Sequence, residues 1–409
     1  MSQLIVVGAG IIGLSSAVFL QQAGFTVTLL DPAQPGTGCS FGNAGHFATE
    51  QVFGLAQPAL LRQLPAMLLK ADSPLSIRAG YLLQAMPWFI RFLANMAPHR
   101  RAAIQQALTA LNRQSLPSWQ LLLQHCQAQP LLQQQGALLV SEQPAARQLQ
   151  AQYTAYQQAG IAVRLLPQAE LLQLEPALSA NIACGLEFTE VGHTANPFAL
   201  CQQLFNTFRQ QGGQYLPYKL LRIIPQGQQQ RLQTDQGELC CDTLLIAAGA
   251  ASHRLCHQLG WKVPLEAERG YHLMVNAVPL SRPVSSAERK FIMTPMHSGL
   301  RLAGTAEFAG LNATANYRRA DMLQHHASAL LTAPLAPLDS NSRWCGNRPS
   351  LPDSLPVLGA CPRHQGIYYN FGHQHLGLTQ AAFSAELISQ CLQQQATAID
   401  ITPFRINRF

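Results

Sequence analysis

Three glycines near the N-terminus have the spacing of residues that bind a dinucleotide. Gly8, Gly10 and Gly13 form the pattern G-x-G-x-x-G between an apolar run at 4–7 and a helical pattern at 13–24. The first glycine permits a tight turn, the second lets a pyrophosphate approach the backbone, and the third lets the helix pack closely against the strand. The pattern predicts phosphate binding at the junction of a strand and a helix.

An acidic residue follows where the ribose of a dinucleotide would lie. Asp31 comes 18 positions after Gly13, at the end of a second apolar run, and its carboxylate can accept hydrogen bonds from the ribose hydroxyls. At the start of the helix, the N–H groups of Ile11 and Ile12 and the positive end of the helix dipole would face the phosphates. A glycine-rich turn in an ordinary α/β fold would not require this acid, so residues 1–31 are predicted to form a dinucleotide-binding βαβ unit.

Later segments favour FAD over NAD as the dinucleotide. A flavin needs further segments whose backbone can approach its pyrophosphate and ring closely. Glycine-containing segments that could do so occur at 37–46, 247–249 and 372–377. The last one precedes a helical pattern whose N-terminus would point at the flavin, where the helix dipole would stabilise the anionic reduced ring. The residues expected to contact the cofactor in these segments are Ser40, Asn43, Ala44, Gly45, Ala248, Gly249, Gly372, His373, Leu376, Gly377, Leu378 and Thr379.

The charge of the chain fits small anionic ligands better than nucleic acid. The formal net charge is +7 at pH 7, but the Lys and Arg residues form no dense cluster of the kind that binds a nucleic-acid backbone. A dinucleotide and a carboxylate substrate would account for the excess of positive charge. Nucleic acid is therefore not an expected partner.

The cysteines indicate neither a disulfide framework nor a metal site. There are ten of them, with no C-x-x-C pair and no His/Cys spacing suited to zinc. The N-terminus lacks the basic region and cleavage site of a secretory signal, and no apolar run reaches the roughly 18 residues that a spanning helix needs. We expect a cytoplasmic protein with buried, reduced cysteines.

Alternating strand-like and helical patterns predict an α/β fold. The predicted architecture is a Rossmann-type FAD-binding domain with an inserted mixed-sheet substrate domain. The FAD-binding domain is expected to comprise 1–55, 190–255 and 344–409, and the substrate domain 56–189 and 256–343.

The first insertion begins with a helical pattern over 57–129. Within it, the stretch 81–97 is strongly apolar and is followed by the basic residues His99, Arg100 and Arg101. One interpretation is an interfacial patch that contacts the inner membrane and meets a quinone. The other is a helix packed inside the substrate domain.

Several segments resemble a known family over the whole length of the chain. In order they are VGAGIIGLSSAVFLQQAGFTVTLLD, SFGNAG, IAAGAAS, ERGYHL, RPSLPDSLPVLG and GHQHLGLT. This order is similar to that of the D-amino-acid dehydrogenase group of the D-amino-acid oxidase superfamily. The N-terminal motif is common among flavoproteins, whereas the segments at 348–353 and 372–373 are more specific. Relatives include glycine and sarcosine oxidases and D-hydroxyproline dehydrogenases.

The resemblance implies a substrate domain over the re face of the flavin and assigns roles to five residues. Arg348 would bind the substrate carboxylate, for which a bidentate guanidinium pair is physically apt; the alternative is an interdomain ion pair. Tyr271 would donate its hydroxyl to the same carboxylate or would be a core tyrosine. His46 and His373 would touch the substrate or the flavin carbonyls, unless they are structural. The backbone of Leu221 would flank the adenine.

The sequence departs from its relatives at some positions. Asp31 stands where many flavoproteins of the superfamily have Glu, and either acid can serve. Phe41 and His46 vary among the relatives, which limits any claim about side-chain specificity. No residue is predicted to be an obligatory general base.

The predicted reaction is oxidation of a small D-amino acid by an FAD-dependent dehydrogenase. A hydride would pass from Cα to flavin N5, and the imino acid would be hydrolysed to a keto acid and ammonia. The expected acceptor of the electrons is quinone-like rather than oxygen. Alternative substrates are cis-4-hydroxy-D-proline and glycine or sarcosine. A flavin-binding protein without amine chemistry and an NAD-dependent dehydrogenase are the other classes.

Overall fold

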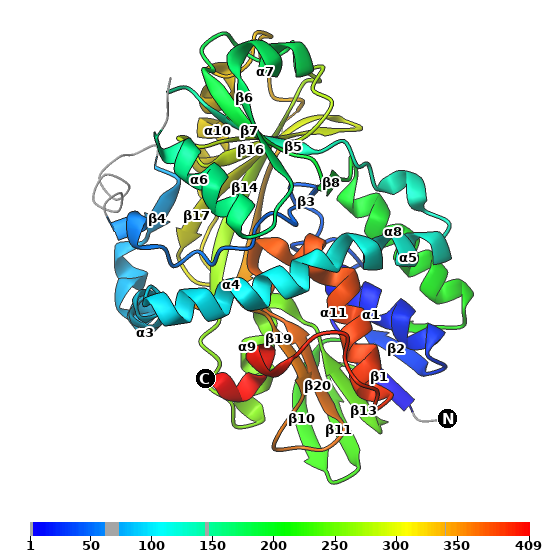
Figure 1. Cartoon of the computed structure of the whole chain (residues 1–409). Helices are drawn as coiled ribbons and strands as arrows, with labels where there is room; N and C mark the ends of the chain where they lie inside the picture. Colours follow the sequence, from blue (N-terminus) through cyan, green and yellow to red (C-terminus); the bar gives the residue numbers. More distant parts are fainter. Residues whose placement is uncertain (1–2, 62–72, 144–146, 340) are drawn as a thin grey trace.

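Two large sheets occupy separate halves of the molecule (Figure 1). The computed structural model describes residues 3–61, 73–143, 147–339 and 341–409. A six-stranded sheet lies in the lower half of Figure 1 and a nine-stranded sheet in the upper half. The prediction of an α/β fold with a Rossmann-type part and a mixed-sheet part is confirmed.

The six-stranded sheet contains the predicted βαβ unit. All its neighbouring strands are parallel, except for one antiparallel edge strand, β19. In spatial order the strands are β19 (Val357–Ala360), β20 (Ile367–Phe371), β13 (Thr243–Ile246), β1 (Gln3–Val7), β2 (Thr26–Leu30) and β9 (Gln214–Leu216).

Both faces of this sheet are covered, which explains its continuous apolar strands. Leu4 and Val6 of β1 enter one core cluster, whereas Ile5 and Val7 enter the cluster on the other face. Helices α1 (Ile11–Gln22), α8 (Pro197–Gln210) and α11 (Gly377–Leu392) contribute to the first cluster. A small sheet, β10 (Leu220–Gln226), β11 (Gln229–Thr234) and β12 (Gly237–Cys241), and helix α9 (Ser252–Gln258) contribute to the second.

The nine-stranded sheet mixes parallel and antiparallel pairs. In spatial order its strands are β18 (Arg343–Ser350), β14 (Glu266–Val275), β17 (Gly299–Phe308), β16 (Phe291–Met296), β15 (Val284–Ser286), β5 (Ala137–Ser141), β7 (Cys184–Phe188) and β6 (Val163–Pro167), and β4 (Leu75–Ile77) pairs with β17. Helices α6 (Arg147–Gln158), α7 (Gln168–Leu174) and α10 (Arg318–Ser328) supply residues to the cores beside it.

Three helices follow β4 along the chain, α3 (Leu82–Ala94), α4 (Pro98–Arg113) and α5 (Ser115–His125). Strand β4 interrupts the interval 57–129, which was expected to be helical throughout; residues 62–72 of that interval lie outside the described residues. α4 crosses between the two halves (Figure 1). Among the described residues, no helix is long and apolar enough to cross a membrane.

Two segments lie in a different half from the one predicted. Helices α4 and α5 contact α11, and Leu108 and Trp119 enter the core cluster that contains α1 and α11. These helices fall within the predicted substrate segment 56–189. Likewise, the predicted boundary between 343 and 344 cuts through β18, all of which lies in the nine-stranded sheet. A two-stranded sheet of β3 (His46–Phe47) and β8 (Gly192–His193) lies between the two large sheets (Figure 1).

Candidate active site

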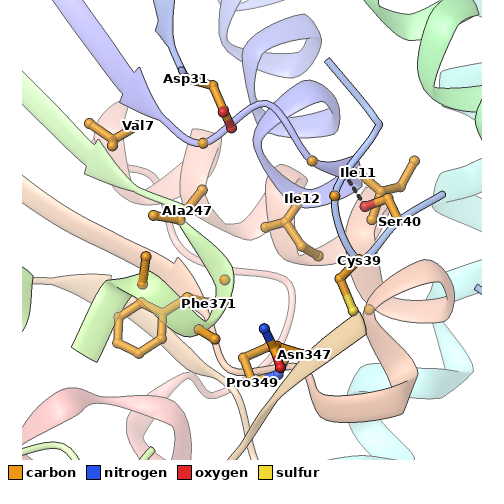
Figure 2. Close-up of a pocket in the computed structure, with 18 of the residues that line it drawn as sticks. Val7, Ile11, Ile12, Asp31, Cys39, Ser40, Ala247, Asn347, Pro349 and Phe371 are labelled. Atoms are coloured by element: carbon orange, nitrogen blue, oxygen red, sulfur yellow. Dashed lines mark hydrogen bonds between the residues drawn. The ribbon is translucent and has the colours of Figure 1, made fainter. Parts of the chain in front are cut away.

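A cavity of about 750 Å³ opens at the carboxyl ends of the parallel strands. It is lined by Val7, Asp31, Ala247 and Phe371 at or just after the ends of four strands, and by Asn347 of β18 on the opposite side (Figure 2). In doubly wound α/β sheets this edge is where ligands bind. The cavity therefore lies between the dinucleotide-binding sheet and the first strand of the nine-stranded sheet.

Most residues that the sequence assigned to the cofactor line this one cavity. They are Gly8, Gly10, Ile11, Ile12, Asp31, Ser40, Asn43, Leu221, Ala248, Gly249, Gly372, His373, Gly377 and Leu378. The predicted residues that do not line it are Ala44, Gly45, Leu376, Thr379, His46, Tyr271 and Arg348, together with Gly13.

The glycine loop owes its shape to two close backbone contacts. Gly8 has φ +108°, and a Cβ at this position would lie 2.3 Å from the Ala247 carbonyl oxygen. A Cβ at Gly13 would lie 1.8 Å from the Gly8 carbonyl oxygen, so α1 packs on the loop at a distance that only glycine allows. These contacts bring the start of α1 to the wall of the cavity.

Asp31 joins the glycine loop to the cavity. Its Oδ2 accepts a hydrogen bond from the Ala9 N–H at 2.8 Å, and its Oδ1 accepts one from the Ala33 N–H at 2.9 Å. Burial raises the pKa of the carboxyl, and the two backbone bonds counteract part of that rise. Each oxygen keeps a second lone pair, with which it can accept a ribose hydroxyl.

The N-termini of two helices face the same cavity. Neither α1, which begins after Gly10, nor α11, which begins after Leu376, has a side-chain cap or an acidic residue in its first turn. At α1, the Ser40 hydroxyl accepts a hydrogen bond from the Ile11 N–H at 2.9 Å (Figure 2). The positive ends of both helix dipoles can therefore act on anionic groups in the cavity.

Two buried polar side chains at the cavity wall have hydrogen-bonding atoms without partners among the described residues. Both ring nitrogens of His373 and Oδ1 of Asn370 are in this state. Burial lowers the pKa of His373 to about 3, so its ring is neutral and has one donor and one acceptor to offer. Buried polar atoms are normally satisfied. Together with Asp31 and the two helix N-termini, these atoms fit FAD.

Loop 37–46 is held against the cavity from the nine-stranded sheet. Arg301 of β17 donates from Nη1 to the Phe41 carbonyl at 3.2 Å and to the Asn43 carbonyl at 2.6 Å. Burial lowers the pKa of Arg301 to about 10. Nδ1 of His272 lies 3.1 Å from the Gly42 carbonyl oxygen. No local sequence pattern connects Arg301 or His272 to a loop more than 200 positions away, so neither residue was predicted.

Predicted residues that lie behind the cavity wall connect its elements. The Thr379 hydroxyl accepts a hydrogen bond from the Ala48 N–H at 2.9 Å, and the Trp119 indole donates to the Leu378 and Thr379 carbonyls at 2.8 and 3.1 Å. The Asn43 side chain accepts from the Gly45 N–H at 2.8 Å. The first three bonds tie Ala48, just after β3, and α5 to the start of α11, and the last bond is internal to loop 37–46.

Arg348 lies beside the cavity and forms an ion pair. Its Nη1 donates to Glu268 Oε1 at 2.9 Å and to the Thr305 carbonyl at 3.0 Å. The flanking residues Asn347 and Pro349 line the cavity. Glu268 belongs to β14, the strand next to β18 in the same sheet, so this ion pair does not connect two domains.

Tyr271 and His46 have protein partners. The Tyr271 hydroxyl donates to Glu307 Oε2 and accepts from the Asn316 N–H at 3.1 Å, and the residue is 1% exposed in the core next to α10. Nε2 of His46 lies 3.0 Å from Glu50 Oε1. Burial alone would lower the pKa of His46, but the Glu50 carboxylate and a backbone carbonyl raise it on balance.

Two further residues close to Arg348 were not predicted. Cys39 is exposed to the cavity but surrounded by protein, and burial raises the pKa of its thiol to about 11, while Arg348 acts to lower it. His375, just before α11, is half-buried, and its pKa is lowered by burial and by Arg348, whereas Glu268 and Glu50 act to raise it. The sequence points to these two residues only through their segments. Cys39 lies in loop 37–46 and His375 in the segment 372–377, both of which were predicted to approach the cofactor.

Known proteins are similar to this chain over nearly its whole length. Residues 3–391 match the family model of the DAO family, described as FAD dependent oxidoreductase. The chain is 32% identical to a D-amino-acid oxidase of Bradyrhizobium diazoefficiens, over 99% of this chain and 98% of the relative. It is 30% identical to D-amino acid dehydrogenase 2 of Ralstonia nicotianae, over 99% and 100% of the two chains.

Solved structures show the same fold. The glycine oxidase of Geobacillus kaustophilus superposes with a TM-score of 0.76 at 21% identity, and the match covers 100% of both chains. The predicted superfamily and the predicted FAD cofactor are confirmed. The chain belongs to the DAO family of FAD-dependent oxidoreductases.

Proposed function

We propose that the protein oxidises a small D-amino acid at Cα and passes the electrons to a quinone-like acceptor. The observation that carries the proposal is an open hydrogen-bonding edge on Arg348. Nη1 is used by Glu268 and Thr305, but within the described residues Nε and Nη2 donate no hydrogen bond, and the side chain remains 23% exposed. Such an edge binds a carboxylate with two parallel hydrogen bonds.

The position of this edge gives the substrate its orientation. Arg348 lies between Asn347 and Pro349, which line the cofactor cavity, and it acts electrostatically on Cys39 at the cavity wall. A carboxylate held by two bonds has its Cα at a defined distance and angle from the guanidinium, so Cα–H can be aimed into the cavity. Bound FAD supplies the redox chemistry by accepting the hydride.

The protein groups near Arg348 contribute binding and orientation. Glu268 accepts hydrogen bonds from Arg348 and, at 2.8 Å, from the Ser350 hydroxyl, which keeps the guanidinium in place. The oxidised product is an imino acid, which water hydrolyses to a keto acid and ammonia. The full-length similarity to relatives named D-amino-acid oxidase and D-amino acid dehydrogenase 2 supports the D configuration.

The test is anaerobic reduction of the bound flavin, followed as bleaching of its visible absorbance. We expect D-alanine to bleach the enzyme, with L-alanine as the stereochemical control. Preferential bleaching by cis-4-hydroxy-D-proline would identify the cyclic secondary amine as the substrate, and preferential bleaching by glycine or sarcosine would identify that compound as the substrate. A flavoprotein that none of these compounds bleaches would contradict the proposal.

Substitution of Arg348 tests the carboxylate contact directly. Because two charge-assisted hydrogen bonds are lost, we expect Arg348→Ala to raise the apparent KM by about 10- to 100-fold, with FAD content unchanged. Arg348→Lys keeps the charge but not the fork and should restore only part of the affinity. An unchanged KM in Arg348→Ala would refute the carboxylate role.

The quinone-like acceptor is supported by an apolar surface on α3. The exposed face of this helix presents Leu82, Leu83, Met86, Ile90 and Leu93, and Leu83 is 84% exposed. His99 and Arg100, at the start of the next helix, are exposed beside it. Apolar residues flanked by cations are typical of helices that lie in a membrane interface, where a quinone would be reached.

Helix α3 is directly connected to the strand of Arg348. On its inner face, the Trp88 indole donates to the Ser350 carbonyl at 3.2 Å and stacks with Phe92 at 5.1 Å. Ser350 is two residues from Arg348 on β18. We therefore assign to α3 a contact with the inner membrane close to the active site.

A further inference from the structure

We propose that Gly270 and Thr305 are positioning residues, which together with Glu268 form a seat that holds the Arg348 guanidinium in its binding orientation. The inference rests on the proposed function, because it concerns the same carboxylate site. We call these three residues the Arg348 seat.

Gly270 provides the floor of the seat. A Cβ built at Gly270 would lie 2.3 Å from Nη2, 2.4 Å from Cζ and 2.8 Å from Nε of Arg348. Three atoms of the guanidinium are thus close to the space that any other side chain would fill, so the planar group lies against the Gly270 backbone. The colliding atoms are the far end of a flexible side chain, so an added methyl group would displace Arg348 rather than unfold the sheet.

Thr305 provides the wall of the seat through an unusual backbone conformation. Its φ is +59°, a left-handed value that is rare and strained for a β-branched residue. The Thr305 hydroxyl has no hydrogen-bond partner among the described residues, so its side chain does not account for this conformation. The carbonyl does have a partner, because it accepts the hydrogen bond from Arg348 Nη1 at 3.0 Å.

The strand pairing shows how this conformation fits into the sheet. The register between β14 and β17 shifts between Arg269 and Tyr271, so that Arg269 pairs with Glu307 and Tyr271 with Gly304. The shift leaves Gly270 opposite an irregular stretch that contains Thr305. Bulges of this kind redirect groups next to active sites, and here the redirected group is the Thr305 carbonyl.

The seat determines which edge of the fork is left for the substrate. Glu268 and the Thr305 carbonyl both accept from Nη1, which leaves the Nε and Nη2 edge for a carboxylate. A fork held in one orientation loses little conformational entropy when it binds. Gly270 and Thr305 therefore act on the substrate through Arg348 and do not need to touch it.

The test compares a carboxylate probe with its neutral isostere. Propionate and propionamide are titrated into the FAD-loaded enzyme, and their affinities are read from the perturbation of the flavin spectrum. For Gly270→Ala we expect about tenfold weaker propionate binding, with unchanged propionamide binding, FAD content and melting temperature. Gly80→Ala is the matched control, because a Cβ at Gly80 meets nothing within 4 Å.

The outcomes distinguish the seat from the proposed function. If Arg348→Ala weakens propionate binding and Gly270→Ala does not, the seat is refuted and the carboxylate role stands. If Arg348→Ala has no effect on propionate, the carboxylate role itself fails, and the seat with it.

A double variant keeps the proposal testable if Gly270→Ala does not fold. Truncation of Arg348 removes the atoms that the new methyl group would meet, so Gly270→Ala with Arg348→Ala should fold and should bind propionate no more weakly than Arg348→Ala alone. A double variant that fails to fold would show that Gly270 is needed for the sheet and would overturn the seat.

Discussion

Asp31 shows how one side chain can serve both the fold and the ligand. Its two oxygens accept backbone N–H groups from Ala9 in the glycine loop and from Ala33 after β2, while the carboxylate lines the cavity. Arg348 is used in a similar way, since Nη1 is bonded to the sheet and the other edge is open. In both residues a protein contact fixes the orientation of the group that would meet the ligand.

Substitution of Asp31 is expected to weaken FAD binding, because its carboxylate serves both the glycine loop and the cavity. In Asp31→Asn one oxygen acceptor is replaced by an amide donor, which would face the Ala9 or the Ala33 N–H. We expect FAD to bind at least about tenfold more weakly, measured from flavin fluorescence on titration of the apoprotein. Asp400→Asn, at an exposed site remote from the cavity, is the control. Equal FAD affinities in both variants would contradict the role of Asp31.

Among the secondary-structure elements, α3 combines two opposite faces. Its inner face carries Ala85 and Trp88, which are buried, and its outer face carries leucines and Ile90 that remain exposed. Burying these outer residues in a lipid interface would remove apolar area from water at about 25 cal/mol per Å². The inner contacts hold this face against the protein, and the outer face stays exposed, as the proposed membrane contact requires.

Charged substitutions on the outer face test this contact. The variant Leu83→Glu with Ile90→Glu should lose binding to vesicles of anionic phospholipid in co-sedimentation, and its activity with a membrane quinone should fall. Activity with a water-soluble dye as acceptor should not change. Leu121→Glu on α5 is the matched control, because Leu121 is 61% exposed outside this surface. Wild-type vesicle binding by the double variant would exclude α3 as the contact.

For the molecule as a whole, buried histidines gather between the two halves. Burial lowers the pKa of His193, on β8, to about 4 and that of His272, on β14, to about 3. His373, beside α11, has a pKa of about 3 for the same reason. All three are neutral in the folded protein, where His272 faces the Gly42 carbonyl. We therefore expect protonation of these rings to disfavour the folded state.

Because burial lowers the pKa values of these histidines, acid is expected to destabilise the folded protein. A histidine whose folded pKa is lowered takes up its proton in the unfolded chain first, so below pH 6.5 the unfolded state binds more protons. We expect the melting temperature of the apoprotein to fall as the pH decreases from 7 to 5. His46, whose pKa is raised, acts in the opposite direction and reduces the total effect.

A single substitution isolates one of these groups. His272→Gln removes the titrating ring, so the fall in melting temperature between pH 7 and 5 should be smaller than in the wild type. Each such histidine contributes at most about 1.4 kcal/mol per pH unit. His99→Gln, at an exposed site, should keep the wild-type profile. The same slope in all three proteins would show that His272 does not control the acid response.

The dinucleotide site could be predicted from local patterns in the sequence. A strand, a glycine turn, a helix and an acid are neighbours along the chain, so Gly8, Gly13 and Asp31 could be placed relative to one another from spacing alone. The same holds for the run that forms β13 and for the start of α11. These features depend on contacts between residues that are close in sequence or on the regular order of a parallel sheet.

The surroundings of Arg348 could not be predicted from residue spacing, because they depend on contacts between residues that are far apart in the sequence. The partners of Arg348 are Glu268 and Thr305, which are 80 and 43 positions away, and its seat requires a bulge with no sequence signature. That bulge falls between Arg269 and Tyr271, and the Tyr271 hydroxyl pairs with Glu307, a residue of the neighbouring strand.

The family, the cofactor and the nucleotide half could be predicted from the residues alone, because these residues follow a local order. The open edge of Arg348, the membership of β18 in the nine-stranded sheet and the packing of α4 and α5 on α11 became known only from the folded chain. Side-chain orientation and sheet membership depend on long-range hydrogen bonds and packing, which bring together residues with no regular separation along the chain.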